Sequence, residues 1–251
     1  MTTYSGDPWS GYQLLRQQHP SPFSAYFNTP EGKLLCHSPE RFIQVADNQV
    51  TTQPIKGTMP RCSDPQQDQL SAETLLASRK DHAENSMIVD LLRNDLAKTC
   101  KPFSIDVPKL CALESFPNVH HLVSTVTGTL EAEHHSMDLL KHSFPGGSIT
   151  GAPKLRAMEI LVDLEPYHRS AYCGSAFYCD PNGSMDSNIL IRSLICCNDN
   201  IYAYAGGGIV YDSNVDDEYQ ESLVKISSLL TLLENNFMTT QSTKDMIDAG
   251  T

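Results

Sequence analysis

The sequence lacks the features that mark secreted, membrane and zinc-finger proteins. No apolar run approaches the roughly 20 residues that a membrane-spanning helix needs, and the N-terminus has no secretory signal peptide. None of the eight cysteines forms a Cys-x-x-Cys pair. We therefore predict a soluble, cytoplasmic protein whose cysteines are reduced thiols.

Positive charge is also scarce. The chain has 18 lysine and arginine residues against 30 aspartate and glutamate residues, which gives a formal net charge of -12. Nucleic acids and anionic membranes bind basic surfaces, so neither is expected as a partner. An anionic small molecule stays compatible with this charge, because a few local cations or a bound metal can reverse the field inside a cleft.

The length allows a large core. A chain of 251 residues with 40% hydrophobic residues resembles ordinary globular proteins and needs no disulfides for stability. We find no repeat, linker or low-complexity block inside it. The prediction is one domain over residues 1–238, followed by a polar tail at residues 239–251 that we expect to be disordered.

The pattern of apolar residues predicts an α+β fold. Antiparallel strands are grouped together and helices bracket them, which argues against a parallel doubly wound sheet. Helices are expected at residues 9–18, 136–143, 153–164 and 215–233, with a longer helical stretch that ends at residue 98. Strands are expected at residues 23–27, 33–36, 41–46, 49–55, 103–107, 112–116, 119–130, 171–179, 188–197 and 201–205.

One lysine is placed in an unusual local setting. Lys56 lies at the tip of a predicted short strand, between Pro54 and Gly57. Proline fixes φ on one side and glycine permits a sharp turn on the other, so the side chain is held in place. A lysine held in this way is a candidate nucleophile or base. The alternative is a solvated lysine in a β-turn.

Acidic residues gather on two predicted helices. Glu84 shares a face with apolar Ile88, and a carboxylate on such a face needs a partner because burial of a bare charge is costly. On the last helix, Glu218, Glu221 and Lys225 lie on one side. Carboxylates from distant segments are how proteins usually hold Mg²⁺. The alternative is two solvated helix N-termini, where acidic residues favour the helix dipole.

Glycine-rich segments and an arginine suggest a site for an acid. Residues 144–154 end at a helix start, where backbone N–H groups can face an anion, and residues 206–208 follow a strand. Arg192 is predicted in mid-strand among apolar residues, with Tyr172 on a neighbouring run. A planar guanidinium suits a carboxylate ligand. A buried structural ion pair is the competing interpretation.

Two adjacent histidines are expected to differ in role. His120 and His121 occupy one predicted strand, so their rings point to opposite faces. No other metal ligand has a suitable spacing, which argues against a zinc site. We expect one of the two to form a hydrogen bond near the acid-binding pocket.

Several motifs follow one another in a fixed order along the chain. They are Ser38-Pro-Glu-Arg-Phe42, Pro54-Ile-Lys-Gly-Thr58, Asp81-His-Ala-Glu-Asn85, Asp90-Leu-Leu-Arg-Asn-Asp95, Pro117-Asn-Val-His-His-Leu122, Gly146 to Lys154, and Gly206-Gly-Gly-Ile209. Taken together, these motifs resemble those of the chorismate-binding enzymes, which include anthranilate, aminodeoxychorismate, isochorismate and salicylate synthases. The resemblance covers roughly Asp7 to Leu233. Lys56 narrows the resemblance to the aminodeoxychorismate synthase component I branch, since anthranilate synthases carry a small residue there.

The resemblance implies a fold and an activity. The fold is a pair of antiparallel β-sheets packed as a sandwich and flanked by helices. The activity is conversion of chorismate and ammonia to 4-amino-4-deoxychorismate, a transferase step of para-aminobenzoate and folate biosynthesis. A glutamine amidotransferase subunit, component II, is the implied source of the ammonia. Mg²⁺ is the implied cofactor.

The resemblance also assigns roles to single residues. Lys56 is expected to attack C2 of the chorismate ring and form a covalent adduct, while Glu40 protonates the departing C4 hydroxyl. Glu84 and Glu221 are expected to hold Mg²⁺, with Glu218 alongside. The expected substrate-binding residues are Tyr172, Arg192, Gly207 and Gly208 for the enolpyruvyl carboxylate, and His121 and Ser148 for the ring pocket.

Other readings stay open at this point. Family members have a large N-terminal region that this chain does not include, so we expect the chain to be a C-terminal catalytic portion. Anthranilate synthase component I is the main alternative activity, and isochorismate synthase is the next. An alternative from another class is a chain that binds chorismate, or an amidotransferase subunit, without turnover.

Overall fold

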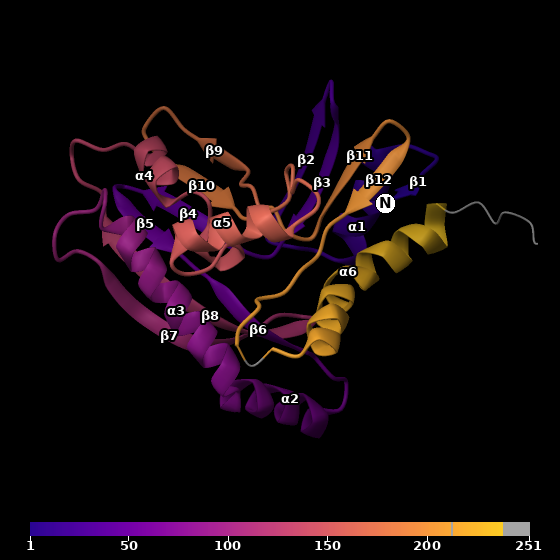
Figure 1. Ribbon diagram of the computed structural model, residues 1–251, viewed down its shortest axis with the longest axis horizontal. Helices are drawn as coiled ribbons and strands as arrows, with labels where there is room; N and C mark the ends of the chain where they lie inside the picture. Colours follow the sequence, from indigo (N-terminus) through magenta and orange to yellow (C-terminus); the bar gives the residue numbers. More distant parts are fainter. Residues whose placement is uncertain (212, 238–251) are drawn as a thin grey trace, which may run out of the picture. The chain divides into compact units, whose positions relative to one another are not determined.

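The computed structural model describes residues 1–211 and 213–237, so the predicted tail at residues 239–251 lies outside the described residues. In the described part, strands form two antiparallel sheets accompanied by helices, which confirms the α+β prediction (Figure 1). The chain divides into two compact units. Unit 1 is Met1–Pro39 with Ile191–Thr251, and unit 2 is Glu40–Leu190. The single domain predicted over residues 1–238 stays a prediction.

Unit 1 is built on one antiparallel sheet. Its strands lie in the order β1 (Thr2–Thr3), β12 (Asn200–Ala203), β11 (Ser193–Cys197), β3 (Gly32–Ser38) and β2 (Phe23–Thr29). Its helices are α1 (Pro8–Gln18) and α6 (Val215–Phe237). Helix α1 begins after Asp7, whose carboxylate accepts from the backbone N–H groups of Trp9 and Ser10. These bounds confirm the predicted terminal helices to within a few residues.

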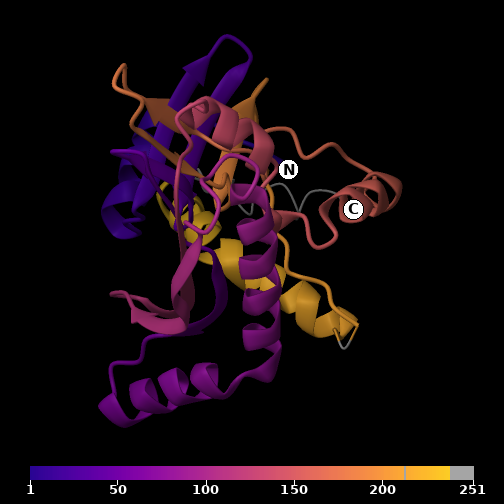
Figure 2. The same cartoon turned by 90° about the vertical axis from the view of Figure 1, so that its left-hand side faces the viewer.

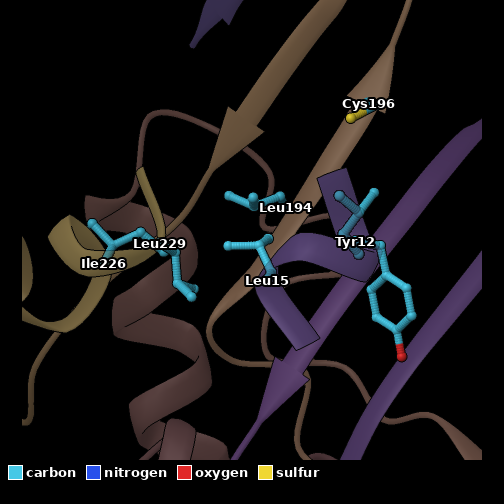
Figure 3. Close-up of a cluster of buried hydrophobic side chains, with 7 residues drawn as sticks. Tyr12, Leu15, Leu194, Cys196, Ile226 and Leu229 are labelled. Carbon is cyan, nitrogen blue, oxygen red and sulfur yellow. The ribbon is translucent and has the colours of Figure 1, made fainter. Parts of the chain in front are cut away.

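The core of unit 1 joins both helices to the sheet. Leu15 of α1 and Leu194 of β11 have no exposed surface, and Ile226 and Leu229 of α6 pack in the same cluster (Figure 3). The remaining buried members are Tyr12, Leu35 and Cys196. Burial of such apolar side chains is the main stabilising term, so this cluster fixes α6 on the unit 1 sheet.

Unit 2 contains the larger sheet. Its strands lie in the order β6 (Ile55–Pro60), β8 (Val119–Thr129), β5 (Gln49–Thr52), β4 (Arg41–Ala46), β10 (Met185–Asn188) and β9 (Phe177–Cys179), while β7 (Asp106–Ser115) also pairs with β8. Its helical elements are α2 (Pro65–Ala77), α3 (Arg79–Leu96), α4 (Ser136–Ser143), the 3₁₀ turn η1 (Gly147–Ile149) and α5 (Lys154–Leu164). Helix α3 lies along β7 and β8 (Figure 1).

The helical stretch predicted to end at residue 98 is two helices. Helix α2 ends and α3 begins at Ser78, where the chain changes direction sharply (Figure 2). Ser78 is extended, with φ -69° and ψ 103°, and its hydroxyl accepts from the backbone N–H of Asp81. Because Ser78 caps the N-terminus of α3, a new helix begins there. The periodicity predicted the helical content of this stretch but not the break at Ser78.

Two predicted strands in the second half of the chain are wrong in extent. The run at residues 171–179 forms a strand at Phe177–Cys179, and Tyr172 lies in a turn before it. The run at residues 188–197 is divided between β10 and β11, which belong to different sheets. Arg192 lies in the link between them with φ +49°, and is therefore not in mid-strand.

Among the described residues, no helix combines the length and the apolar composition that a membrane span needs.

Candidate active site

The predicted site residues are divided between the two units. Unit 2 contains Glu40, Lys56, Glu84, His121, Ser148 and Tyr172. Unit 1 contains Arg192, Gly207, Gly208, Glu218 and Glu221. Each unit brings some of its own members together, as follows.

Lys56 of β6 is the centre of the unit 2 group. Its side chain is 16% exposed, and its Nζ lies 3.8 Å from Oε2 of Glu84 on α3. The same Nζ donates to the backbone carbonyl of Ser148 at 3.3 Å. Three elements far apart in sequence therefore meet at one amine. The alternative of a solvated lysine in a β-turn does not describe this environment.

A β-bulge aims the Lys56 side chain. The register of β6 against β8 shifts between Lys56 and Thr58, where Gly57 has φ +75°. A Cβ at Gly57 would lie 2.8 Å from Leu75 Cδ1 and 2.9 Å from Asp81 Cγ, so only glycine fits without displacement. Bulges redirect a side chain next to a site, and this one also fits the expectation that Gly57 makes a sharp turn.

Glu84 lies on the buried face of α3, as its apolar neighbours predicted. It is 9% exposed, and Ile88 one turn later is buried with it. Lys80 approaches Glu84 Oε1 at 4.0 Å from the solvent side, with 46% of its own side chain exposed. Two cations thus face the carboxylate, and the nearer one is Lys56. A buried carboxylate with this partner satisfies the requirement for pairing.

The two adjacent histidines have separate partners. His121 Nδ1 lies 2.9 Å from Thr58 Oγ1 and packs edge-on against the Phe116 ring. His120 Nδ1 lies 2.8 Å from Ser115 Oγ, and its Nε2 lies 3.2 Å from Asp68. The different contacts agree with the expected difference in role. His121 is the one beside the bulge of β6.

The loop Phe144–Pro153 carries Ser148 and is closely packed. A Cβ at Gly146 would lie 2.6 Å from Ile189, and one at Gly147 would lie 2.6 Å from Leu91. Backbone N–H groups of Ile149, Thr150 and Gly151 donate to the Gly146 and Gly147 carbonyls. These amides are therefore used within the loop, and the group of this loop that meets Lys56 is a carbonyl.

Glu40 and Tyr172 are the remaining unit 2 members. Glu40 precedes β4 and is 5% exposed, and its backbone carbonyl accepts from the Ile189 N–H at 3.2 Å. Tyr172 lies in the turn before β9, where its backbone N–H donates to the Arg169 carbonyl at 2.9 Å. Burial, with a smaller contribution from Cys173, raises the pKa of the Tyr172 phenol, which therefore keeps its proton at neutral pH.

In unit 1, two carboxylates lie against a glycine. A Cβ at Gly207 would lie 2.7 Å from Glu218 Oε2 and 3.6 Å from Glu221 Oε1. Glu218 is 7% exposed and accepts from Ser213 Oγ at 2.6 Å. Lys225 lies 2.6 Å from Glu221 and also donates to the Gly206 carbonyl. The start of α6 and the glycine-rich segment thus form one cluster.

Arg192 is positioned by its backbone. Its carbonyl accepts from the His37 N–H at 3.1 Å, which attaches the link before β11 to the end of β3. A left-handed conformation costs a non-glycine residue about 1–2 kcal/mol, so the surrounding structure holds Arg192 there. The expected face shared with Tyr172 along two adjacent strands is wrong, because neither residue is in a strand.

The donor chemistry suits a hard divalent cation in part. Neither unit, over its described residues, gathers three or more histidine, cysteine, aspartate or glutamate side chains into a metal site. Unit 1 does bring Glu218 and Glu221 to one glycine that has no room for a Cβ. Carboxylate oxygens are the ligands that Mg²⁺ prefers, and it usually keeps several waters, so a pair of carboxylates fits it.

Two residues that contact the loop of Ser148 or its ends were not predicted as site residues from the sequence. Lys154 donates to Asp95 and to the Ser143 carbonyl, and Arg169 donates to the Ile149 carbonyl beside Ser148. The sequence did contain a signal for Lys154. A cation in the first turn of a helix interacts unfavourably with the helix dipole, which indicates that another contact compensates for it. Arg169 lies in a polar turn and gives no such signal.

Comparison with known proteins decides the family. Residues 1–231 match the family described as chorismate binding enzyme. The chain belongs to the chorismate-binding enzyme family. The resemblance expected from the motifs is confirmed.

Among curated relatives of the family, aminodeoxychorismate synthase component 1 of Klebsiella aerogenes is 52% identical over 233 residues, which are 93% of this chain and 52% of that protein. Anthranilate synthase component 1 of Saccharolobus solfataricus is 41% identical over 92% of this chain and 55% of that protein. The chain therefore spans about half the length of the curated relatives it matches.

Solved structures of the family agree in fold. Anthranilate synthase component I from Streptococcus pneumoniae TIGR4 matches with a TM-score of 0.82 and 37% identity, over 91% of this chain and 50% of that chain. A putative 2,3-dihydroxybenzoate-specific isochorismate synthase from Bacillus anthracis matches with a TM-score of 0.81 and 26% identity, over 94% of this chain and 64% of that chain.

Proposed function

We propose that this chain carries the chemistry of aminodeoxychorismate synthase component I, the conversion of chorismate and ammonia to 4-amino-4-deoxychorismate. The observation that carries the proposal is Lys56, a partly buried amine held between the Ser148 carbonyl and Glu84. Relatives with that name are 50–52% identical to the chain, which supports the same branch.

Two side chains carry the covalent steps of the proposal. The neutral amine of Lys56 attacks C2 of the ring, both ring double bonds shift by one position, and the C4 hydroxyl departs. Glu40 supplies the proton with which that hydroxyl leaves as water. Ammonia then adds at C4 and expels the lysine. A lysine amine is a recognised covalent catalyst of this kind, since it is both a good nucleophile and a leaving group.

Binding of the two substrate carboxylates is assigned to other residues. We assign Arg192, Tyr172 and the amides of Gly207 and Gly208 to the enolpyruvyl carboxylate. His121 and Ser148 are assigned to the ring pocket. Glu84, Glu221 and Glu218 would hold Mg²⁺, which would supply positive charge to the ring carboxylate. Two anchors of this kind explain how a chain with a net charge of -12 accepts a dianion.

The partner and the location follow from the same proposal. An amidotransferase subunit, component II, supplies ammonia from glutamine, and free ammonia replaces it in vitro. The reaction belongs to the cytoplasm, where the eight cysteines of the chain, which form no disulfide in the structure, stay reduced. This part is tested directly by mixing the chain with a purified amidotransferase and glutamine and measuring amination of chorismate.

The decisive experiment is mass spectrometry of the chain after incubation with chorismate and Mg²⁺. A chorismate adduct that has lost water is expected on the peptide that contains Lys56. Lys56→Ala should abolish it and leave chorismate binding by calorimetry within about threefold, because the amine is one contact among several. Lys80→Ala is the matched control, since Lys80 also faces Glu84 but is half exposed, and it should keep the adduct. Undiminished amination by Lys56→Ala would refute the nucleophile.

Anthranilate synthesis is the second candidate. The relative from Saccharolobus solfataricus with that name, at 41% identity, favours it. It requires elimination of pyruvate, which the Lys56 route does not. Detection of pyruvate and anthranilate, in place of 4-amino-4-deoxychorismate, separates the two activities.

A further inference from the structure

The loop Phe144–Pro153 of unit 2 determines where one contact of Lys56 lies. The Ser148 carbonyl accepts from Lys56 Nζ at 3.3 Å. Gly146 and Gly147 pack their backbone directly on Ile189 and Leu91, which places the first half of the loop. The second half, from Ser148 onward, is packed less closely, since a Cβ at Gly151 would lie 3.3 Å from Ala157 Cβ. Backbone hydrogen bonds to the Gly146 and Gly147 carbonyls hold it, together with side chains from outside the loop.

Lys154 closes the base of the loop. Its Nζ donates to the Ser143 carbonyl at 2.7 Å and to Asp95 Oδ2 at 2.5 Å. Ser143 is the residue before the loop and Lys154 is the residue after it, so one ammonium group ties the two ends together. Asp95 is 1% exposed and Lys154 is 15% exposed, so the pair is shielded from solvent and stronger than a surface pair.

Arg169 holds the loop next to Ser148. Its Nη1 donates to the Ile149 carbonyl at 2.9 Å. Its Nε and Nη2 donate to the two carboxylate oxygens of Glu165 at 2.8 and 2.6 Å. The paired bonds to Glu165 fix the guanidinium plane, so Nη1 is aimed at the loop. The peptide held by Arg169 is adjacent to the one that Lys56 contacts.

We propose that Lys154 and Arg169 are positioning residues for the Lys56 amine. They act through the loop, since they fix its ends and its second half and thereby fix the Ser148 carbonyl. The inference deepens the proposed function and rests on it in one respect, because it takes Lys56 as the reacting group.

The competing explanation is that the two cations merely stabilise unit 2. Other cations of the unit offer matched controls for that explanation. Arg156 on α5 pairs with Glu159 at 2.8 Å and makes no hydrogen bond to the loop within the described part of the chain. Lys98 also donates to Asp95, at 2.9 Å, and its other bond is to the His142 carbonyl, outside the loop. Loss of either control residue removes a charge and an ion pair but leaves the loop contacts in place.

The experiment compares Arg169→Met with Arg156→Met, and Lys154→Met with Lys98→Met. Three quantities are measured on folded chain: hydrogen exchange of the peptide with residues 146–151, acylation of Lys56 relative to Lys80 by acetyl N-hydroxysuccinimide, and kcat and KM for chorismate. The first two need no substrate. Arg169→Lys is added because it keeps the charge but loses the paired bonds to Glu165.

We expect loop exchange and Lys56 acylation to become faster and kcat to become lower. In Arg169→Met and Lys154→Met, loop exchange should become about tenfold faster and Lys56 should acylate severalfold faster, because the amine is released from its carbonyl. The kcat should fall about tenfold to a hundredfold with a smaller change in KM, because misplacement of a reacting group by 1 Å has effects of that size. Arg169→Lys should recover part of each change. The Arg156 and Lys98 controls should resemble wild type.

Loop exchange and Lys56 acylation that match the controls in both test variants would overturn the proposal. If Arg169→Met does not fold, Arg169→Lys and Lys154→Met decide the same question. If wild type itself forms no adduct and no product, the proposed function fails. The exchange and acylation results still decide whether the two cations position Lys56.

Discussion

Gly57→Ala tests how the bulge of β6 holds Lys56. Gly57 has φ +75°, and adoption of this conformation by alanine costs about 1–2 kcal/mol. The new Cβ would also lie 2.8 Å from Leu75 Cδ1 and 2.9 Å from Asp81 Cγ, and overpacking of this kind costs about 1–3 kcal/mol. The two terms add to about 2–5 kcal/mol, a large part of the roughly 5–15 kcal/mol that stabilises a typical protein.

Gly183→Ala separates the two terms. Gly183 has φ +89°, and a Cβ there meets no atom within 4 Å. This variant is therefore destabilised by the cost of the positive φ alone. Both glycines belong to unit 2. The free energy of unfolding of both variants is measured by urea unfolding followed by far-UV circular dichroism. Tryptophan fluorescence is less suitable, because Trp9, the one tryptophan of the chain, lies in unit 1. Gly57→Ala should be less stable than Gly183→Ala by about 1–3 kcal/mol.

The same variant has a predicted effect on chemistry. A shift of the bulge moves Lys56 relative to Ser148 and Glu84, so formation of the Lys56 adduct should slow by about tenfold or more in Gly57→Ala, even where the variant is fully folded. Gly183→Ala should form the adduct at the wild-type rate. Equal stability of the two variants, or equal adduct rates, would contradict the argument that packing at Gly57 positions Lys56.

Two further predictions concern unit 1 and are measured by Trp9 fluorescence during urea unfolding. Burial, followed by the charge of His19, lowers the pKa of His37 from 6.5 to about 4, so the folded chain stays unprotonated there while the unfolded chain binds a proton. Stability should be full above pH 6.5 and fall as the pH drops to about 4, by at most about 3 kcal/mol, and His37→Leu should flatten this slope. Leu15→Ala should cost about 2–5 kcal/mol because Leu15 is fully buried, whereas Leu223→Ala, at a 42% exposed position, should cost less than about 1 kcal/mol. An unchanged pH slope or equal costs for the two leucines would contradict these expectations.

Local chemistry in the sequence predicted much of the fold. The strands expected at residues 41–46 and 49–55 leave Asp47 and Asn48 between them, and both residues have the positive φ of a tight hairpin turn, at 50° and 60°. Helix α4 has the predicted bounds, since its periodicity is interrupted by the Phe144-Pro145 break. Pro54 and Gly57 indicated that Lys56 is held. In each case the deciding interaction lies within a few residues of the feature.

The failures have the opposite cause. The apolar run at residues 188–197 has the composition of one strand, yet the chain leaves one sheet and enters another within it. Nothing local marks that passage apart from Arg192, whose positive φ is uncommon for arginine. The turn at Tyr172 was missed for the same reason, because apolar residues around it pack in unit 2 without forming strand pairs. Tertiary packing overrides strand propensity in such runs.

The buried face of α3 explains which part of the site could be foreseen. Glu84 and Asp95 share that face with Ile88, so each carboxylate required a cation. Each found a lysine from a distant segment, Lys56 for Glu84 and Lys154 for Asp95. The sequence predicts the need for partners but not their identity, because the pairing depends on how the loop and β6 meet α3. In the proposed function, one pair lies at the amine assigned as the nucleophile, and the other pair ties the ends of the loop that contacts this amine. Substitution of Asp95 should therefore alter the position of the Lys56 amine through the loop.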